Sequence, residues 1–244
     1  MASKQNSPLY QKYVVFYGDS LCYARGERGD SQEPEVIRRS GYAGRIATEY
    51  DMTLSVHAYS GQSISDVRYG LYKHMEKRIM TIPAEEREKV DYVILEGGVN
   101  DIVNQAPLGT LSEDESKLDT STFAGAVQRY LLLAKEAYPY ATVGCIITYR
   151  MPIAEHWYNN EAIPEVRDLE NCERYYALLI QACEKYGVAV LDLFHNDTFC
   201  DKIFKVTTTA RHDKNANMLA DGVLITAHGY DTLAPIIAQW METL

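Results

Sequence analysis

The sequence predicts an α/β protein in which helices cover both faces of a parallel β-sheet. Near-continuous apolar segments rich in β-branched residues recur along the chain, and segments with helical periodicity lie between them. Strands of a parallel sheet are buried on both faces, so they read as uninterrupted apolar segments rather than as alternating polar and apolar residues. The alternation of such strands with helices indicates a layer of helices on each side of one sheet.

Four segments have the composition of buried strands. They are Tyr13 to Tyr17, Val90 to Leu95, Thr142 to Thr148 and Val188 to Leu193. A fifth candidate, Thr53 to Ala58, is more polar and fits the edge of a sheet. We expect helices over Phe123 to Ala137 and Asn171 to Tyr186, where apolar residues recur at intervals of three and four.

The size of the chain favours a single domain. Its 244 residues, 46% of them hydrophobic, are enough to bury one large core. We see no internal repeat, low-complexity tract or linker that would divide it. We therefore expect one domain over residues 1–244, in which residues 1–12 form an extended N-terminal segment.

The charge of the chain argues against nucleic-acid and membrane partners. The formal net charge is −10, and no cluster of Lys and Arg is longer than a pair such as Arg38 and Arg39. A protein that neutralises phosphates needs a basic patch. We expect neither nucleic acid nor an anionic membrane surface as a partner.

Cysteine usage and the N-terminus indicate a reduced, cytoplasmic protein. The five cysteines are odd in number and form no C-x-x-C pair, which argues against a disulfide framework and against a zinc site. The histidines have no metal-ligand spacing such as H-E-x-x-H, and we expect no metal ion and no cofactor. The first residues lack the apolar core of a signal peptide. Secretion stays open if a signal peptide was removed.

Polar residues follow three of the predicted strands. The groups are Gly18-Asp19-Ser20, Ser60-Gly61 and Gly98-Val99-Asn100-Asp101. Taken one at a time, such residues are ordinary turn formers. In an open parallel sheet, however, ligands bind beyond the carboxyl ends of the strands. Three such groups at one edge of one sheet therefore predict a functional site there.

These groups, in this order, resemble sequence blocks of the SGNH (GDSL-type) serine hydrolase family. The first block is Gly18-Asp19-Ser20-Leu21, and Gly98 to Asp101 fits the family's G-x-N-D. The resemblance implies a three-layer α/β/α sandwich with a five-stranded parallel sheet in flavodoxin-like order. It also implies that Ser20 is the nucleophile, and that an oxyanion hole is formed by the N–H groups of Ser20 and Gly61 and the amide of Asn100. Such donors stabilise the negative charge that develops during ester hydrolysis.

The fourth block departs from the family pattern. Asp221 to Tyr230 resembles D-G-x-H-x-T-x-x-G-Y, which supplies the acid and the base of a catalytic triad, but Leu224 stands at the histidine position. A leucine cannot accept a proton, and a serine hydroxyl is a poor nucleophile unless a base removes its proton. A histidine occurs four residues later, at His228.

Three hypotheses follow from this departure. In the first, His228, or His212 from the preceding irregular stretch, reaches Ser20 and restores the triad. In the second, Asp221 or water acts as a weak base in a slow enzyme. In the third, the pocket binds a ligand without hydrolysing it. His228 also fits a plain surface or capping position in the first turn of the last helix, residues 226–240.

The expected substrate is a small ester. Tyr149 and Trp157 lie in an irregular segment after the fourth strand, where aromatic rings can form a platform for a sugar ring, although ordinary loop packing also accounts for them. The resemblance implies an ester or acetylated carbohydrate, since many relatives act on such esters. We therefore predict a serine esterase working through an acyl-serine. The alternative is a catalytically impaired protein that binds a carbohydrate or ester, and a nucleotide-binding role is disfavoured because no G-x-G-x-x-G follows the first strand.

Overall fold

The predicted five-stranded parallel sheet is confirmed in a computed structural model, which describes residues 4–28, 31, 33–155, 161–203 and 222–244. All neighbouring strands are parallel, in the order β2-β1-β3-β4-β5. This is the flavodoxin-like order. The strands are β1 (Tyr13–Gly18), β2 (Thr53–Ala58), β3 (Tyr92–Glu96), β4 (Thr142–Ile147) and β5 (Ala189–Asp192).

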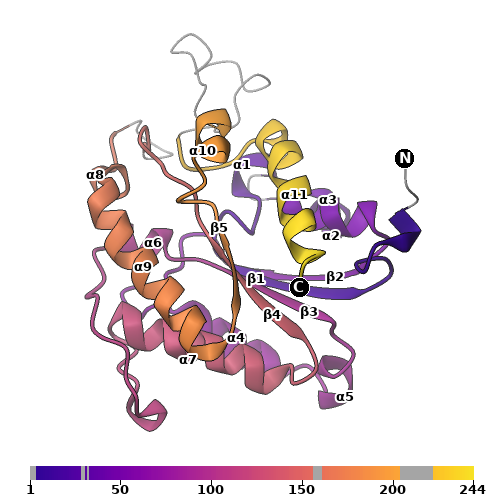
Figure 1. Ribbon diagram of the computed structural model, residues 1–244, viewed down its shortest axis with the longest axis horizontal. Coiled ribbons are helices and arrows are strands. Elements are labelled where there is room, and N and C mark those ends of the chain that lie inside the picture. Colours follow the sequence, from indigo (N-terminus) through magenta and orange to yellow (C-terminus); the bar gives the residue numbers. More distant parts are fainter. Residues whose placement is uncertain (1–3, 29–30, 32, 156–160, 204–221) are drawn as a thin grey trace.

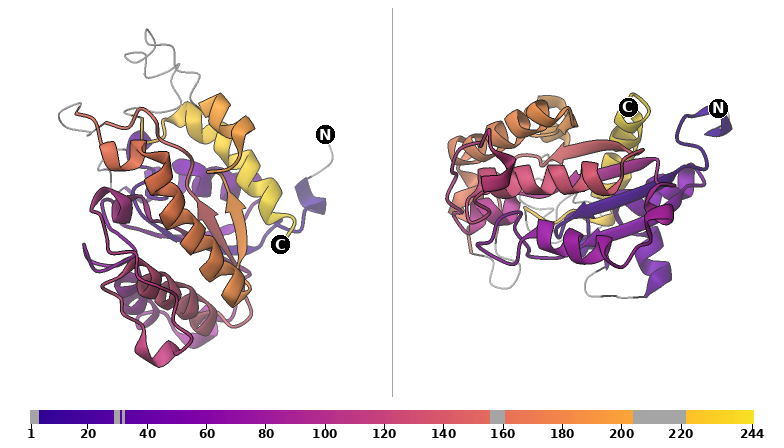
Figure 2. Two further views of the ribbon diagram at one scale, coloured as in Figure 1. Left: turned by 60° about the vertical axis from the view of Figure 1, so that its left-hand side comes forward. Right: turned by 90° about the horizontal axis from the view of Figure 1, so that it is seen from below.

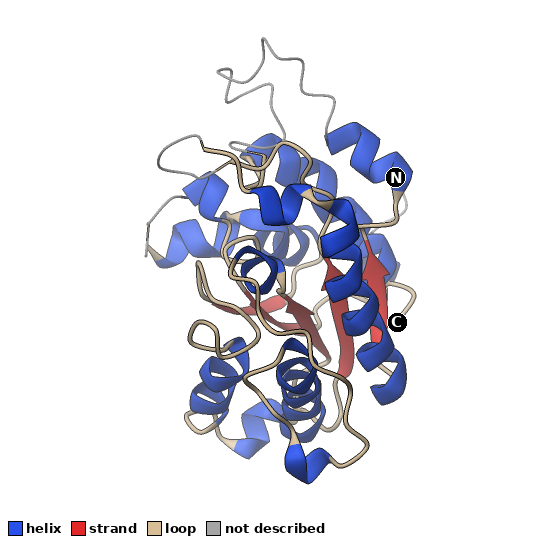
Figure 3. Ribbon diagram, turned by 90° about the vertical axis from the view of Figure 1, so that its left-hand side faces the viewer, coloured by secondary structure: helices blue, strands red, loops and turns tan. Residues whose placement is uncertain are grey.

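Helices cover both faces of the sheet (Figures 2 and 3). On one face α3 (Gly41–Glu49) packs against α11 (Ala227–Met241), and on the other face α7 (Phe123–Ala137) packs against both α4 (Leu71–Ile79) and α9 (Leu169–Tyr186). The three-layer α/β/α arrangement predicted from the sequence is therefore confirmed. The shorter helices (Figure 1) are α1 (Arg25–Arg28), α2 (Pro34–Arg39), α5 (Ala84–Arg87), α6 (Val99–Val103), α8 (Pro164–Arg167) and α10 (Asp197–Ile203).

Side chains at the ends of the long helices set their boundaries. The Thr122 hydroxyl accepts a hydrogen bond from the N–H of Gly125 at the start of α7. The Asp168 carboxylate accepts from two N–H groups in the first turn of α9. That helix ends at Gly187, whose φ is +61°. Such caps pair the backbone groups that a helix end leaves without partners.

The central strands bring their carboxyl ends together. Every residue of β3, and every residue of β1 after Tyr13, is buried, whereas β2 is an edge strand that lies partly exposed. In the register of the sheet Gly18 pairs with Ala58, and Tyr17 pairs with Leu95. The residues that follow β1, β2 and β3 are therefore neighbours at one edge of the sheet.

The described part of the N-terminal segment, from Lys4 onward, is not extended. Residues 4–10 instead form the 3-10 helix η1 (Lys4–Asn6) followed by turns. The Lys4 ammonium lies 2.8 Å from a carboxylate oxygen of Glu49, and the Ser7 hydroxyl donates to Glu242 over 2.6 Å. These contacts hold the segment against the ends of α3 and α11. Of the helices described, none combines the length and the apolar character needed to cross a bilayer.

Tyr230 ties the last helix to the turn that carries Ser20. Its buried hydroxyl donates to the carbonyl oxygen of Leu21 over 2.6 Å. The variant Y230F removes this hydrogen bond, while the carbonyl keeps its second donor, the N–H of Ala24 at 3.1 Å. We expect a loss of about 0.5–1.5 kcal/mol in the free energy of unfolding. Urea denaturation measures this loss.

Tyr130 provides the matched control. Its hydroxyl is also buried but has no hydrogen-bond partner in the described part of the chain. We expect Y130F to change the free energy of unfolding by less than about 0.5 kcal/mol or to raise it, because no hydrogen bond is lost. Equal losses in the two variants would contradict the importance of the bond to Leu21.

Candidate active site

Ser20 lies in a tight turn directly beyond the end of β1. The N–H of Leu21 donates to a carboxylate oxygen of Asp19 over 3.0 Å, and the N–H of Arg25 donates to the carbonyl of Ser20 over 3.0 Å. The Asp19 side chain is fully buried, whereas Ser20 is half-buried. The turn therefore keeps the aspartate inside the protein and leaves the serine partly accessible.

Gly61 lies in the turn that follows β2, next to β1. The N–H of Tyr59 donates to the carbonyl of Gly18 over 2.9 Å, which ties this turn to the first strand. Gly61 has a φ of +76°, and a Cβ atom added to it would meet nothing within 4 Å. Glycine is therefore required here by the left-handed backbone rather than by crowding. The space beside Gly61 is open, as a position facing a substrate requires.

Asn100 lies in the first turn of α6, directly after β3. Its amide nitrogen Nδ2 donates to the Asp19 carboxylate over 3.0 Å. This bond joins the G-x-N-D block to the turn that carries Ser20. Since an amide NH2 group has two N–H donors, one remains for a ligand. The structure therefore gathers Ser20, Gly61 and Asn100 at the same edge of the sheet.

Two further carboxyl groups organise this edge. Asp101, fully buried, accepts from the N–H groups of Ile64 and Ser65 over 2.7 and 2.9 Å and so fixes the loop after Gly61. Burial raises the pKa of Asp101 to about 6, although these donors oppose the shift. Glu96, at the end of β3, accepts from the N–H of Asp19 over 3.1 Å. Sequence reasoning assigned neither residue a role, but a carboxylate that ends an apolar strand was a visible signal for Glu96.

The fourth block is described from Gly222 onward. Leu224 is buried, with 7% of its surface exposed, in a strap that also includes Val223 and Ile225. The carbonyl oxygen of Ile225 lies against Gly26 of α1, where a Cβ atom would be 2.2 Å away. The strap therefore packs directly on the helix that follows the Ser20 turn. An apolar side chain is buried in it where the family pattern has a histidine.

Of the two histidines considered as the base, only His228 lies within the described residues, and it is exposed. His228 is exposed in the first turn of α11, and its side chain makes no hydrogen bond within the described ranges. The remaining candidates, Asp221 and His212, lie outside the described residues, as does Trp157. The described part of the site therefore contains the proposed oxyanion donors but no histidine that could accept the serine proton.

Tyr149 does not present a ring to solvent. Only 2% of its surface is exposed, and its hydroxyl donates to the carbonyl oxygen of Val223. Its ring packs edge-on against Phe199 at a centroid distance of 6.1 Å. In this arrangement Tyr149 fastens the strap to the end of β4, which accounts for its conformation without a ligand.

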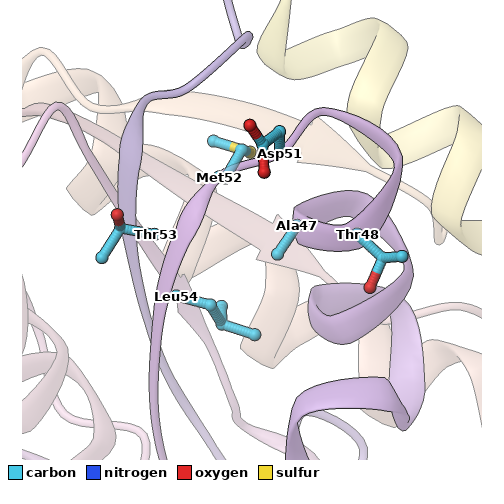
Figure 4. Close-up of a pocket in the computed structure, with 6 residues that line it drawn as sticks. All are labelled: Ala47, Thr48, Asp51, Met52, Thr53 and Leu54. Atoms are coloured by element: carbon cyan, nitrogen blue, oxygen red, sulfur yellow. The ribbon is translucent and has the colours of Figure 1, made fainter.

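A cavity of about 470 Å³ lies elsewhere on the molecule (Figure 4). Its lining comes from the end of α3 and the start of β2 and includes Ala47, Asp51 and Leu54. The start of β2 is the amino end of the strand, whereas Ser20 follows a carboxyl end, so this cavity is separate from the candidate active site. Among the described residues, no three His, Cys, Asp or Glu side chains gather as metal ligands would.

Comparison with known proteins identifies the family of the chain. Residues 16–231 match the model of the GDSL-like lipase/acylhydrolase family. The chain belongs to this family. The match begins within β1 and reaches into α11, so the GDSL-like region includes part of β1 and the other four strands. No curated protein shows significant sequence similarity to the chain.

Solved structures share the GDSL-like fold at low sequence identity. A protein from Lactobacillus plantarum is 21% identical with a TM-score of 0.68, and the alignment covers 96% of this chain and 98% of that one. An acetyl-xylooligosaccharide esterase from Geobacillus is 15% identical with a TM-score of 0.58, covering 96% and 95%. A lipase/acylhydrolase from Enterococcus faecalis is 16% identical with a TM-score of 0.55, covering 96% of each chain. At these identities the similarity establishes the fold.

Gly61 and Gly187 allow a test of the backbone requirement at the site. Both have positive φ, +76° and +61°, and a Cβ atom at either would meet nothing within 4 Å. We expect G61A and G187A each to lower the free energy of unfolding by about 1–2 kcal/mol, because only the left-handed conformation is penalised. Urea denaturation measures both. A loss in G61A several times that in G187A would show that the side chain, rather than the backbone, is resisted at position 61.

Proposed function

We propose that this protein is a slow serine acylhydrolase that cleaves small esters through an acyl-serine at Ser20. The observation that carries the proposal is the hydrogen bond from the Asn100 amide to Asp19, beside Ser20. It supports an oxyanion hole because it orients an amide whose second N–H is available to substrate. The open space at Gly61 supports the same role for its N–H.

In the proposed reaction the Ser20 oxygen attacks the carbonyl carbon of the ester. A bond forms between them, the serine proton leaves to a base, and the carbonyl oxygen becomes negatively charged. The N–H groups of Ser20 and Gly61 and the Asn100 amide would stabilise that charge; removing one such donor typically costs about 10²–10³ in rate. The alcohol then leaves with a proton, and water hydrolyses the acyl-serine to release the acid.

The proposed site lacks a histidine base for the Ser20 proton among the described residues. With Leu224 at the histidine position and His228 exposed, we assign the serine proton to a weak base, Asp221 or water. General-base catalysis by a positioned side chain is worth about 10²–10⁴ in rate. A site that keeps its oxyanion donors without that base retains part of its catalytic power. We therefore expect slow turnover rather than none.

An acetylated carbohydrate is our proposed natural substrate. One structural neighbour is an acetyl-xylooligosaccharide esterase, which supports an acetyl ester attached to a sugar. We also propose that Trp157 contacts the sugar. A contact by Tyr149 would require the strap to move, because its hydroxyl is bonded to Val223.

The second candidate function is binding of a carbohydrate or ester without turnover. The buried position of Leu224 favours it, since an apolar side chain there cannot accept a proton. Calorimetric binding of an acetylated xylooligosaccharide, with no release of acetate, would support this candidate over the first.

Hydrolysis of p-nitrophenyl acetate tests the proposed function. We expect slow turnover by the wild type that falls to the uncatalysed rate in S20A, because no acyl-serine can form. L224H should raise Ser20-dependent turnover by at least about tenfold, since a histidine base contributes about 10²–10⁴. H228A should leave the rate unchanged.

L224Q is the matched control for L224H, because glutamine introduces polarity without a proton acceptor of suitable pKa. It should give no gain. Turnover by S20A equal to that of the wild type would exclude the acyl-serine mechanism. A silent wild type that binds acetylated sugar would establish the second candidate.

A further inference from the structure

Glu96 is a buried carboxyl group that the proposed reaction does not use. Only 2% of its surface is exposed. One carboxyl oxygen accepts from the N–H of Asp19 over 3.1 Å, and the other accepts from the Thr148 hydroxyl over 3.3 Å. A Cβ atom at Gly18 would lie 2.6 Å from the same Glu96 oxygen that accepts from Asp19. Glycine at the start of the GDSL block therefore leaves room for this side chain.

The carboxyl groups of Asp19 and Glu96 interact directly. Burial raises the pKa of Glu96 well above its ordinary value, and the charge of Asp19 raises it further. Burial also raises the pKa of Asp19, to about 6, although hydrogen bonds from Leu21, Glu96 and Asn100 oppose the shift. Two carboxyl groups can form a hydrogen bond only if one of them carries a proton. The Asp19 carboxylate accepts from the N–H of Leu21 and from the Asn100 amide, each over 3.0 Å, whereas one Glu96 oxygen accepts only from the Thr148 hydroxyl over 3.3 Å. The closer donors around Asp19 favour the negative charge there and the proton on Glu96.

Among the described residues, no basic group interacts with Glu96. The titratable groups that interact with it come from the Ser20 turn, α3, α7, β4, α9 and α11, and none of them in the described part of the chain is basic. They are Asp19, Cys22, Tyr42, Tyr130, Cys145, Tyr176 and Tyr230.

We propose that Glu96 is a positioning residue of the active site, and that its carboxyl group keeps its proton at neutral pH and donates it in a hydrogen bond to the Asp19 carboxylate. Asp19 then accepts from Glu96 on one side and from the Asn100 amide on the other. This bond orients Asn100 so that its second N–H faces the substrate. The effect on turnover rests on the esterase function proposed above, whereas the proton on Glu96 does not.

Ionisation of Asp19 has opposite effects on turnover and on stability. Below about pH 6 Asp19 takes up a proton, loses an acceptor site and holds Asn100 less well, so Ser20-dependent turnover should fall. Because the folded pKa of Asp19 lies above its unfolded value, its contribution to stability is present below about pH 4 and lost as pH rises through about 6. The ionised form that the site needs is therefore the form that burial disfavours.

Infrared spectroscopy tests the proton on Glu96 without relying on activity. We expect a C=O stretching band of a protonated carboxyl group in the wild type at about pH 8, where an ordinary glutamate is ionised. E96Q should lack this band, and D101N should retain it. If E96Q fails to fold, a pH titration of the wild-type band answers the same question. Absence of the band from the wild type at about pH 8, or its persistence in E96Q, would overturn the proposal.

The pH dependence of turnover tests the positioning role. E96Q keeps an N–H donor toward Asp19 and should preserve the fall in rate near pH 6, whereas E96L loses the donor and should shift that fall upward. At about pH 6 we expect E96L to be several-fold slower than E96Q. If the band behaves as expected but no variant hydrolyses ester, the proposed function fails and the Glu96 assignment stands. If turnover depends on Ser20 but the band is absent, only the Glu96 assignment fails.

Discussion

A carboxyl group buried away from solvent needs hydrogen-bond donors from the protein, and the arrangement of this site depends on how Asp19 obtains them. One donor comes from its own turn, through Leu21, and another comes from α6, through the Asn100 amide. Its own N–H donates to Glu96 on β3. Satisfying one buried side chain therefore fixes the Ser20 turn, the end of β3 and the first turn of α6 relative to one another.

The parallel sheet makes this possible because β1 lies between β2 and β3. The turns that follow these strands start from the same edge, so Gly61 and Asn100 reach the Ser20 turn from opposite sides. Asp101, the residue after Asn100, is a second buried carboxylate that binds a neighbouring segment. It accepts hydrogen bonds from two N–H groups of the loop after Gly61. Buried carboxyl groups thus hold the Ser20 turn, the loop after Gly61 and the first turn of α6 in place.

The sequence predicted the architecture well because its strands are apolar and its helices carry clear end signals. The helix over Phe123 to Ala137 has the predicted boundaries, and Thr122 caps it. The third strand begins at Tyr92 rather than at Val90, because the Asp91 carboxylate accepts from the N–H of Tyr13 and pairs with Lys12 before the ladder starts. Asp91, a polar residue inside an apolar segment, indicates this later start of the strand.

Parts of the site could not be predicted because they depend on contacts between distant segments. Tyr149 follows β4 as expected, but its burial results from a bond to Val223, 74 residues away. Burial of Leu224 depends on packing of the strap against α1, which no local pattern reveals. The exposure of His228 follows from its place in the first turn of α11, which the motif spacing did predict.

Covalent capture shows whether Ser20 is an activated nucleophile. A fluorophosphonate reacts with an activated serine hydroxyl: an O–P bond forms, fluoride leaves and the serine proton is released. We expect slow formation of a single adduct per chain, mapped by peptide mass spectrometry to Ser20. It should be absent from S20A and form more slowly in G61A than in G187A. A folded wild-type protein that forms no adduct, or an adduct that persists in S20A, would contradict a nucleophilic role for Ser20.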